Sequence, residues 1–257
     1  YTQSAKTNLE DKNQTVISVS EAVNYLKSAL QITPENTTLQ SDLQNAQLYL
    51  TAFQNFIQMN WVPAITNLTQ IVSVDEGFAG GNARALLYES LSALGKQYYS
   101  AGFYADARSN FEQAEIIAWK TPENILRMFQ VQVNLGDTIG MMGDYKNANS
   151  YYQYALDSAK VLTKLNNFPS VSTQLSEASN FAAANDEQNA YNKYKEAMTQ
   201  IYLVFTTSEV SINSGACLAL FADANLSTVN AIQNVNVIPQ DMIIPYSLEL
   251  TVPSIQN

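Results

Sequence analysis

Small and apolar residues recur along the chain with the spacing of one face of a helix. In each of five segments an alanine is followed by small, apolar or aromatic residues four and seven positions later. These segments start at Ala22, Ala64, Ala107, Ala148 and Ala190. Positions i, i+4 and i+7 lie on one side of an α-helix, so each segment predicts a helix with one packed face. The starting alanines are about 42 residues apart, which predicts five repeated units.

A second set of small residues predicts that each repeated unit is a helical hairpin. A small residue lies twelve positions before each of the last four alanines, at Ala52, Gly95, Gly136 and Ala178. Turn-forming residues lie between the two small positions, at Gly102, at Gly143 with Asp144, and at Asn185 with Asp186. Each unit is therefore expected to be a first helix, a tight turn and a second helix. The small residues mark the closest approach of the two helix axes, because a larger side chain would hold the helices apart.

Two of the units resemble the tetratricopeptide repeat. The motif of that family has a Leu-Gly pair, a tyrosine, a small residue, an aromatic residue and a second small residue. It matches Leu94, Gly95, Tyr98, Ala107, Phe111 and Ala114, and again Leu135, Gly136, Ile139, Ala148, Tyr152 and Ala155. The resemblance covers about residues 15–200 and implies a mainly α fold, a right-handed α-solenoid of about five helical hairpins. The period exceeds the ~34 residues usual for such repeats.

The resemblance also implies where a partner would bind. In such an array the concave face is lined by the first helix of each hairpin. The first-helix residues that are not assigned to packing are Tyr49, Phe53, Glu89, Lys96, Tyr99, Gln130 and Asp137. These seven residues are the predicted binding surface for a protein partner.

The first unit lacks a convincing first helix. The segment before Ala22, residues 2–15, is too polar to suggest one. A solenoid end with an unpaired helix exposes an apolar face unless something covers it. Residues upstream of Tyr1 could cover it, or a neighbouring copy of the chain could do so, and the second alternative predicts self-association.

The last fifty residues differ in character from the repeats. Residues 208–257 contain β-branched clusters and no Lys or Arg, and they predict a strand, two helices and a final strand. This order resembles the LysM glycan-binding module. Three features carry the match: the strand that ends at Gly215, the helix that ends at Asn236, and the segment "IIPYSLELTVP". We therefore expect two domains, a helical repeat domain over 1–205 and a small α+β module over 206–257.

The LysM resemblance implies two loops that hold N-acetylglucosamine polymers. The corresponding residues here are Gly215, Ala216 and Cys217 in one loop, and Ile244, Pro245 and Tyr246 in the other. The chain departs from the family in both loops. Ala216 and Cys217 replace the usual Asp-Thr, and Tyr246 stands where the family has a glycine. The polar side chains that would grip a sugar are thus absent, and the resemblance supports the fold more than the site.

Composition and charge narrow the class of function. The formal net charge is −10, from 13 Lys+Arg and 23 Asp+Glu, which argues against binding a nucleic acid backbone. No stretch is apolar for the ~18 residues that a membrane span needs. The chain is rich in polar uncharged residues and tyrosine, which favours an extracellular or cell-surface location. Asn-x-Ser/Thr sequons, as possible N-glycosylation sites, occur at Asn13, Asn36, Asn67 and Asn225.

No combination of residues predicts catalysis, a metal site or a cofactor. The chain has no His and one Cys, which removes Ser-His and Cys-His nucleophile pairs. No phosphate-binding loop, dinucleotide fingerprint or metal-binding motif occurs. Two hypotheses follow. In the first, the chain is a non-catalytic cell-surface scaffold that binds protein partners through its repeats and cell-wall or matrix glycan through its C-terminal module. In the second, it is a structural subunit that polymerises head to tail into an extracellular filament.

Overall fold

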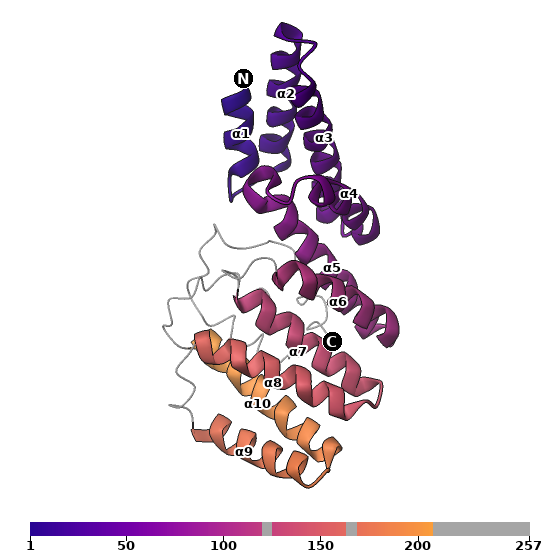
Figure 1. Cartoon of the computed structure of the whole chain (residues 1–257), viewed down its shortest axis with the longest axis vertical. Coiled ribbons are helices and arrows are strands. Elements are labelled where there is room, and N and C mark those ends of the chain that lie inside the picture. The colour runs from indigo at the N-terminus through magenta and orange to yellow at the C-terminus, as the bar shows by residue number, and fades with distance from the viewer. Residues whose placement is uncertain (120–124, 163–168, 208–257) are drawn as a thin grey trace, which may run out of the picture. The chain divides into compact units, whose positions relative to one another are not determined.

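The structure, a computed structural model, describes residues 1–119, 125–162 and 169–207 (Figure 1). In these ranges the regular structure is helical throughout and comprises ten α-helices and one short 3-10 turn. The chain divides into two compact units, residues 1–94 and residues 95–257. The mainly α prediction is therefore confirmed for the described part of the chain. The predicted C-terminal module, with its six loop residues, lies outside the described residues.

The first unit contains four helices, the 3-10 turn and the beginning of a fifth helix. Their bounds are α1 (Thr2–Glu10), α2 (Val16–Ile32), α3 (Thr37–Ile57), α4 (Trp61–Val74), η1 (Phe78–Gly81) and α5 (Asn82–Ser100). Helix α5 crosses the boundary between the units, which lies between Leu94 and Gly95.

The second unit begins with the end of α5 and contains the remaining helices. Their bounds are α6 (Tyr104–Trp119), α7 (Ile125–Met141), α8 (Tyr145–Leu162), α9 (Pro169–Ala183) and α10 (Glu187–Thr207). Helix α7 packs against α6 and α8, and α10 packs against α8 and α9.

Successive helices pack in pairs, as the repeat pattern predicts. The pairs α1–α2, α3–α4, α7–α8 and α9–α10 are each in contact, and Phe111 of α6 lies against Gly95 of α5. The five alanines that define the period lie in α2, α4, α6, α8 and α10, and each is fully buried. The predicted hairpins are thus present within the described residues, and the fold is compatible with a helical repeat.

The glycines of the repeat mark very close contacts between the two helices of a pair. A Cβ atom built at Gly95 would lie 2.6 Å from Cε1 of Phe111, and one at Gly136 would lie 2.6 Å from Cε1 of Tyr152. Real Cβ atoms do not approach other atoms this closely, so these positions have no room for a side chain. Phe111 and Tyr152 each lie four residues after a starting alanine of the repeat. Because each ring must meet the glycine of the first helix, the spacing of twelve residues between that glycine and the alanine is kept.

Four of the hairpin turns share one backbone motif. In each turn one residue has a positive φ, namely Met59, Gly102, Gly143 or Asn185. The amide of the next residue donates to the carbonyl five residues earlier, as from Phe103 to Tyr98 and from Asp144 to Ile139. This is the Schellman motif, which satisfies the last carbonyl groups of a helix and reverses the chain. Gly102, Gly143 and Asn185 were predicted from the sequence, whereas Met59 was not recognised.

The prediction that the first unit lacks its first helix is wrong. Residues Thr2–Glu10 form α1, which packs against α2 and buries Ala5 and Leu9. Two apolar residues suffice because side-chain amides satisfy the carbonyl groups where α1 ends. Gln14 Nε2 donates to the Leu9 carbonyl at 2.5 Å, and Asn82 Nδ2 donates to the Leu9 and Asp11 carbonyls at 2.9 and 3.0 Å. The open end that motivated the filament hypothesis is therefore covered by α1.

The contact at Gly136 predicts the effect of adding a single methyl group there. In an unconstrained helix, Gly→Ala stabilises by about 1 kcal/mol. At Gly136 the methyl group would push the Tyr152 ring aside and weaken its hydrogen bond to Asp137. Overpacking of this kind costs about 1–3 kcal/mol. We expect Gly136→Ala to lower the free energy of unfolding by about 1 kcal/mol net, measured by urea denaturation.

The matched control is Asn192→Ala, at an exposed position of α10. This substitution gains helix propensity without meeting a neighbour, so it should leave the stability unchanged or slightly higher. If Gly136→Ala stabilised the chain as much as Asn192→Ala, the close contact between α7 and the Tyr152 ring would not exist in solution.

Candidate functional site

The structure places the seven predicted partner-binding residues in two kinds of environment. Tyr49, Glu89 and Gln130 are buried, and Tyr49 is only 1% exposed. The other four, which are Phe53, Lys96, Tyr99 and Asp137, are partly exposed. The second group is better placed to meet a partner. Of these four, Tyr99 and Asp137 belong to one cluster of side chains in the second unit.

Asp137 on α7 is the charged centre of that cluster. Its Oδ1 atom accepts a hydrogen bond from the Tyr152 hydroxyl at 2.6 Å. The same oxygen lies 3.3 Å from Nζ of Lys195 on α10 and forms an ion pair with it. The Asp137 side chain is 26% exposed and the Lys195 side chain 44%. The ion pair is therefore held by the fold on one side and open to solvent on the other.

Tyrosine rings surround the ion pair. The Tyr191 ring stacks on the Tyr152 ring with centroids 5.6 Å apart, and Tyr145 lies 5.4 Å from Tyr191 on another side. Lys195 Nζ lies 5.7 Å from the Tyr191 centroid, within the range of a cation–π interaction. Tyr99 on α5 meets Tyr104 edge to face at 5.5 Å. We name Tyr99, Asp137, Tyr152, Tyr191 and Lys195 the tyrosine cluster.

The backbone of α7 explains how the rings reach these positions. Gly136 and Gly140 are one helical turn apart, and their missing side chains leave room for the rings of Tyr152 and Tyr191 respectively. A Cβ atom at Gly140 would overlap the Tyr191 ring. Tyr191 and Lys195 are also one turn apart, on α10, so both face α7. The cluster is thus set by two helix-to-helix contacts rather than by a loop.

Burial and charge raise the pKa values of the cluster. Burial, followed by the nearby Asp137 carboxylate, raises the pKa of Tyr99 to about 12. The same two causes raise the pKa of Tyr152 well above its usual value. Burial, the largest single influence, would lower the pKa of Lys195, but the Asp137 carboxylate acting together with Tyr191 and Tyr99 outweighs it, and the pKa is raised. At neutral pH the cluster therefore holds one ion pair among neutral phenols.

The parts of the cluster that reach solvent are the Asp137–Lys195 ion pair and Tyr99. The rings of Tyr152 and Tyr191 are buried beside them. Among the described residues, no group of three or more His, Cys, Asp or Glu side chains could hold a metal ion. No helix in the described ranges has both the length and the apolar character of a membrane span.

Three residues of the cluster were not predicted as binding residues. Tyr152 was assigned to packing, and Tyr191 and Lys195 were not singled out. A usable signal was present in the sequence, because Tyr191 directly follows a period-defining alanine and Lys195 follows it by one helical turn. The link from α10 to Asp137 depends on tertiary packing.

The four sequons lie in different environments. Asn13 is exposed between α1 and α2. The side chain of Asn36 caps α3 by accepting a hydrogen bond from the Leu39 amide at 3.1 Å, and Asn67 lies within α4. Asn225 lies outside the described residues. Glycosylation at these positions stays a prediction.

Comparison with known proteins leaves the family open. No family model and no curated protein matches the chain. Among solved structures, the chain is similar to the crystal structure of BtubC (BKLC) from P. vanneervenii. That match has a TM-score of 0.38 and 14% sequence identity, and it covers 93% of this chain and 87% of the other.

The raised pKa of Tyr99 gives a prediction for alkaline titration. The tyrosinate absorbance of the folded chain, with that of Tyr99→Phe subtracted, should rise at a pH of about 12. An ordinary tyrosine titrates near pH 10. Because the folded pKa is the higher one, the unfolded chain loses the proton first. The free energy of unfolding should therefore fall as the pH rises from about 10 toward 12.

Unfolding the chain in urea is the control for this titration. The difference curve should then move to about pH 10, because burial and the Asp137 carboxylate no longer act on the phenol. A difference curve already centred near pH 10 in the folded chain would mean that Tyr99 is not held in the cluster.

Proposed function

We propose that the chain is a non-catalytic interaction scaffold that binds an extended peptide segment along the first helices of its hairpins. In this proposal the hairpins form a right-handed solenoid of the tetratricopeptide type, as the sequence motif implies. The tyrosine cluster is the anchor for the bound segment. The single observation that carries the proposal is the ion pair of Asp137 and Lys195, which is partly exposed to solvent and contacts Tyr152 and Tyr191.

Tyrosine is well suited to such a role. Its ring buries a large apolar area at a low cost in side-chain entropy, and its hydroxyl exchanges hydrogen bonds with a peptide backbone. Residues of this type dominate the binding energy of protein interfaces when they lie in preformed positions. The buried rings of Tyr152 and Tyr191 already lie against the glycines of α7, so these two side chains need no ordering in the binding step.

The other parts of the hypothesis have narrower support. Glycan binding by residues 206–257 and an extracellular location follow from the LysM resemblance and the composition alone. The filament alternative has lost its N-terminal motivation, since α1 covers α2. Its remaining support is the abundance of Tyr, Asn and Gln in the sequence and the predicted strand-rich tail, which lies outside the described residues. We therefore prefer the scaffold.

The proposal predicts that Tyr99 contributes far more to peptide binding than Tyr154 does. Peptides selected from a random display library on the full chain should bind Tyr99→Ala at least tenfold more weakly than the unchanged chain, as expected for an interface anchor. Fluorescence anisotropy with the selected peptides measures the affinities. Tyr154→Ala is the matched control, because Tyr154 is 55% exposed on α8 and outside the cluster; its affinity should stay within about twofold.

Two outcomes would contradict the proposal. One is a library selection that yields no peptide above background. The other is a set of peptides whose affinity is lowered equally by Tyr99→Ala and Tyr154→Ala.

A further inference from the structure

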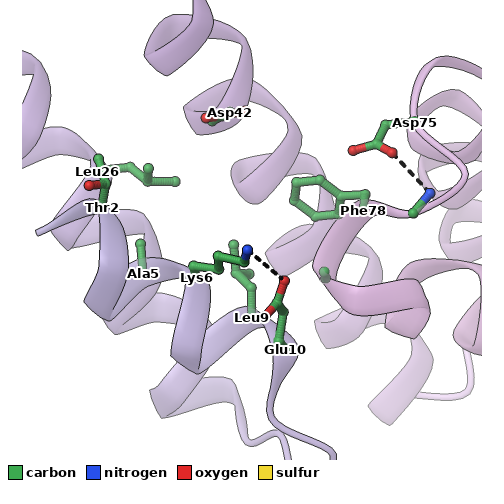
Figure 2. Close-up of a pocket in the computed structure, with 11 residues that line it drawn as sticks. Thr2, Ala5, Lys6, Leu9, Glu10, Leu26, Asp42, Asp75 and Phe78 are labelled. Carbon is green, nitrogen blue, oxygen red and sulfur yellow. Dashed lines mark hydrogen bonds and ion pairs between the residues drawn. The ribbon is translucent and has the colours of Figure 1, made fainter.

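The first unit contains a cavity that plays no part in the tyrosine cluster. Its volume is about 320 Å³, and it lies between α1, α2, α3 and the segment that leads into η1 (Figure 2). The volume is at the lower end of the range for sites that bind small organic groups. It is formed by segments that are far apart in the sequence, from Thr2 to Ala79.

Part of the wall is apolar and rigid. It is formed by the side chains of Ala5, Leu9, Leu26, Phe78 and Ala79, all of which are buried. The Phe78 ring is held by an edge-to-face contact with Tyr49, with centroids 5.9 Å apart. Tyr49 is itself hydrogen-bonded to Gln14. This wall would accept a short alkyl chain without rearranging.

The rest of the lining carries an excess of negative charge. The lining contains three carboxylates, Glu10, Asp42 and Asp75, and one ammonium group, Lys6. Lys6 lies 3.7 Å from Glu10 and forms an ion pair with it (Figure 2). Asp75 accepts a hydrogen bond from the Gly77 amide at 2.9 Å. Two negative charges, on Asp42 and Asp75, therefore remain without a cation in the cavity.

Asp42 is the least compensated of the three carboxylates. Among the described residues it has no hydrogen bond and no ion pair. Burial, followed by repulsion from Asp75, raises the pKa of its carboxyl group above the usual value. A carboxylate that is partly removed from water and repelled by a neighbour gains most from a cation placed beside it.

We propose that this cavity binds a primary alkylammonium group, with the ammonium beside Asp42 and Asp75 and the alkyl chain against Leu9, Leu26 and Phe78. The lining selects this chemistry in two ways. An anion would be repelled by the carboxylates, and a neutral chain would leave Asp42 without a partner. A bare metal ion would gain nothing from the apolar wall. The inference does not depend on the proposed peptide binding by the second unit.

The probes are n-pentylamine, methylamine and n-pentanol, titrated into the full chain and followed by NMR shifts of the Gly77, Phe78 and Ala79 amides. We expect saturable binding of pentylamine and much weaker binding of pentanol. Each buried methylene contributes up to about fourfold in affinity, so methylamine should bind far more weakly than pentylamine. Nα-acetyl-lysine methylamide is a second arm, which mimics a lysine side chain in a peptide. Tighter binding of this mimic would identify the natural ligand as a lysine side chain of a protein. Tighter binding of pentylamine would identify it as a free alkylamine.

Two matched variants make the test specific. Asp42→Asn removes the uncompensated charge with little change in shape, and it should weaken pentylamine binding at least fivefold. Glu35→Gln removes one exposed carboxylate that does not line the cavity, and it should leave the affinity unchanged. Asp42→Asn also relieves the repulsion with Asp75, so we expect this variant to stay folded and its loss of affinity to report on the removed charge.

Three results would overturn the inference. Pentanol could bind as tightly as pentylamine, or methylamine as tightly as pentylamine. The two variants could also lower the affinity equally, which would show only a general attraction of cations to an acidic chain.

Discussion

The close approach of paired helices at small residues is the constraint on which the rest of the structure depends. At Gly95 and Gly136 the ring of the partner helix occupies the space where a side chain would be. Such contacts fix both the distance between the helices and their register, because only one position on the first helix can accept the ring. The Schellman turns then place the second helix in register, since each reverses the chain with the same hydrogen bonds.

The same constraint produces the tyrosine cluster. Tyr152 is a packing residue of its hairpin, and its ring lies on Gly136. Its hydroxyl therefore arrives beside Asp137, the residue that follows Gly136, and donates to it. Gly140 repeats the arrangement one turn later and accepts Tyr191 from α10. A feature that looks like a binding site is thus an extension of core packing to the surface.

The sequence predicts those parts of the fold that are determined by contacts between residues close together in the chain, and it misses those that depend on contacts between distant segments. The hairpins follow from a period of about 42 residues and from turn residues that adopt positive φ, so they are predictable. Helix α1 was missed because only Ala5 and Leu9 are buried in it. Its end is held by the amide of Asn82, more than seventy residues away. Periodicity cannot reveal a helix that depends on such hydrogen bonds.

The candidate sites show the same limit more strongly. Tyr99 and Asp137 could be selected as first-helix residues outside the packing pattern, and the structure brings them together. The sequence places Lys195 one helical turn after Tyr191, but it does not reveal the partner of Lys195, because the ion pair with Asp137 joins α10 to α7. The cavity in the first unit has no sequence signal, since its lining comes from separate segments whose meeting is a product of tertiary packing.

The charge of the chain gives the two sites different physical characters. In the second unit the cation Lys195 is paired with Asp137, so the cluster is close to neutral. In the first unit Asp42 and Asp75 have no such cation among the residues that the structure describes, and a chain with 13 Lys+Arg against 23 Asp+Glu has few to supply. Salt screens exposed charges over about 10 Å at 0.1 M, but it affects stacking and apolar burial little. A ligand of the cavity should therefore depend on ionic strength, and a ligand of the tyrosine cluster should depend on it much less. Because ligand binding at the two sites depends differently on ionic strength, measuring affinity against salt concentration distinguishes the two sites without mutating the chain.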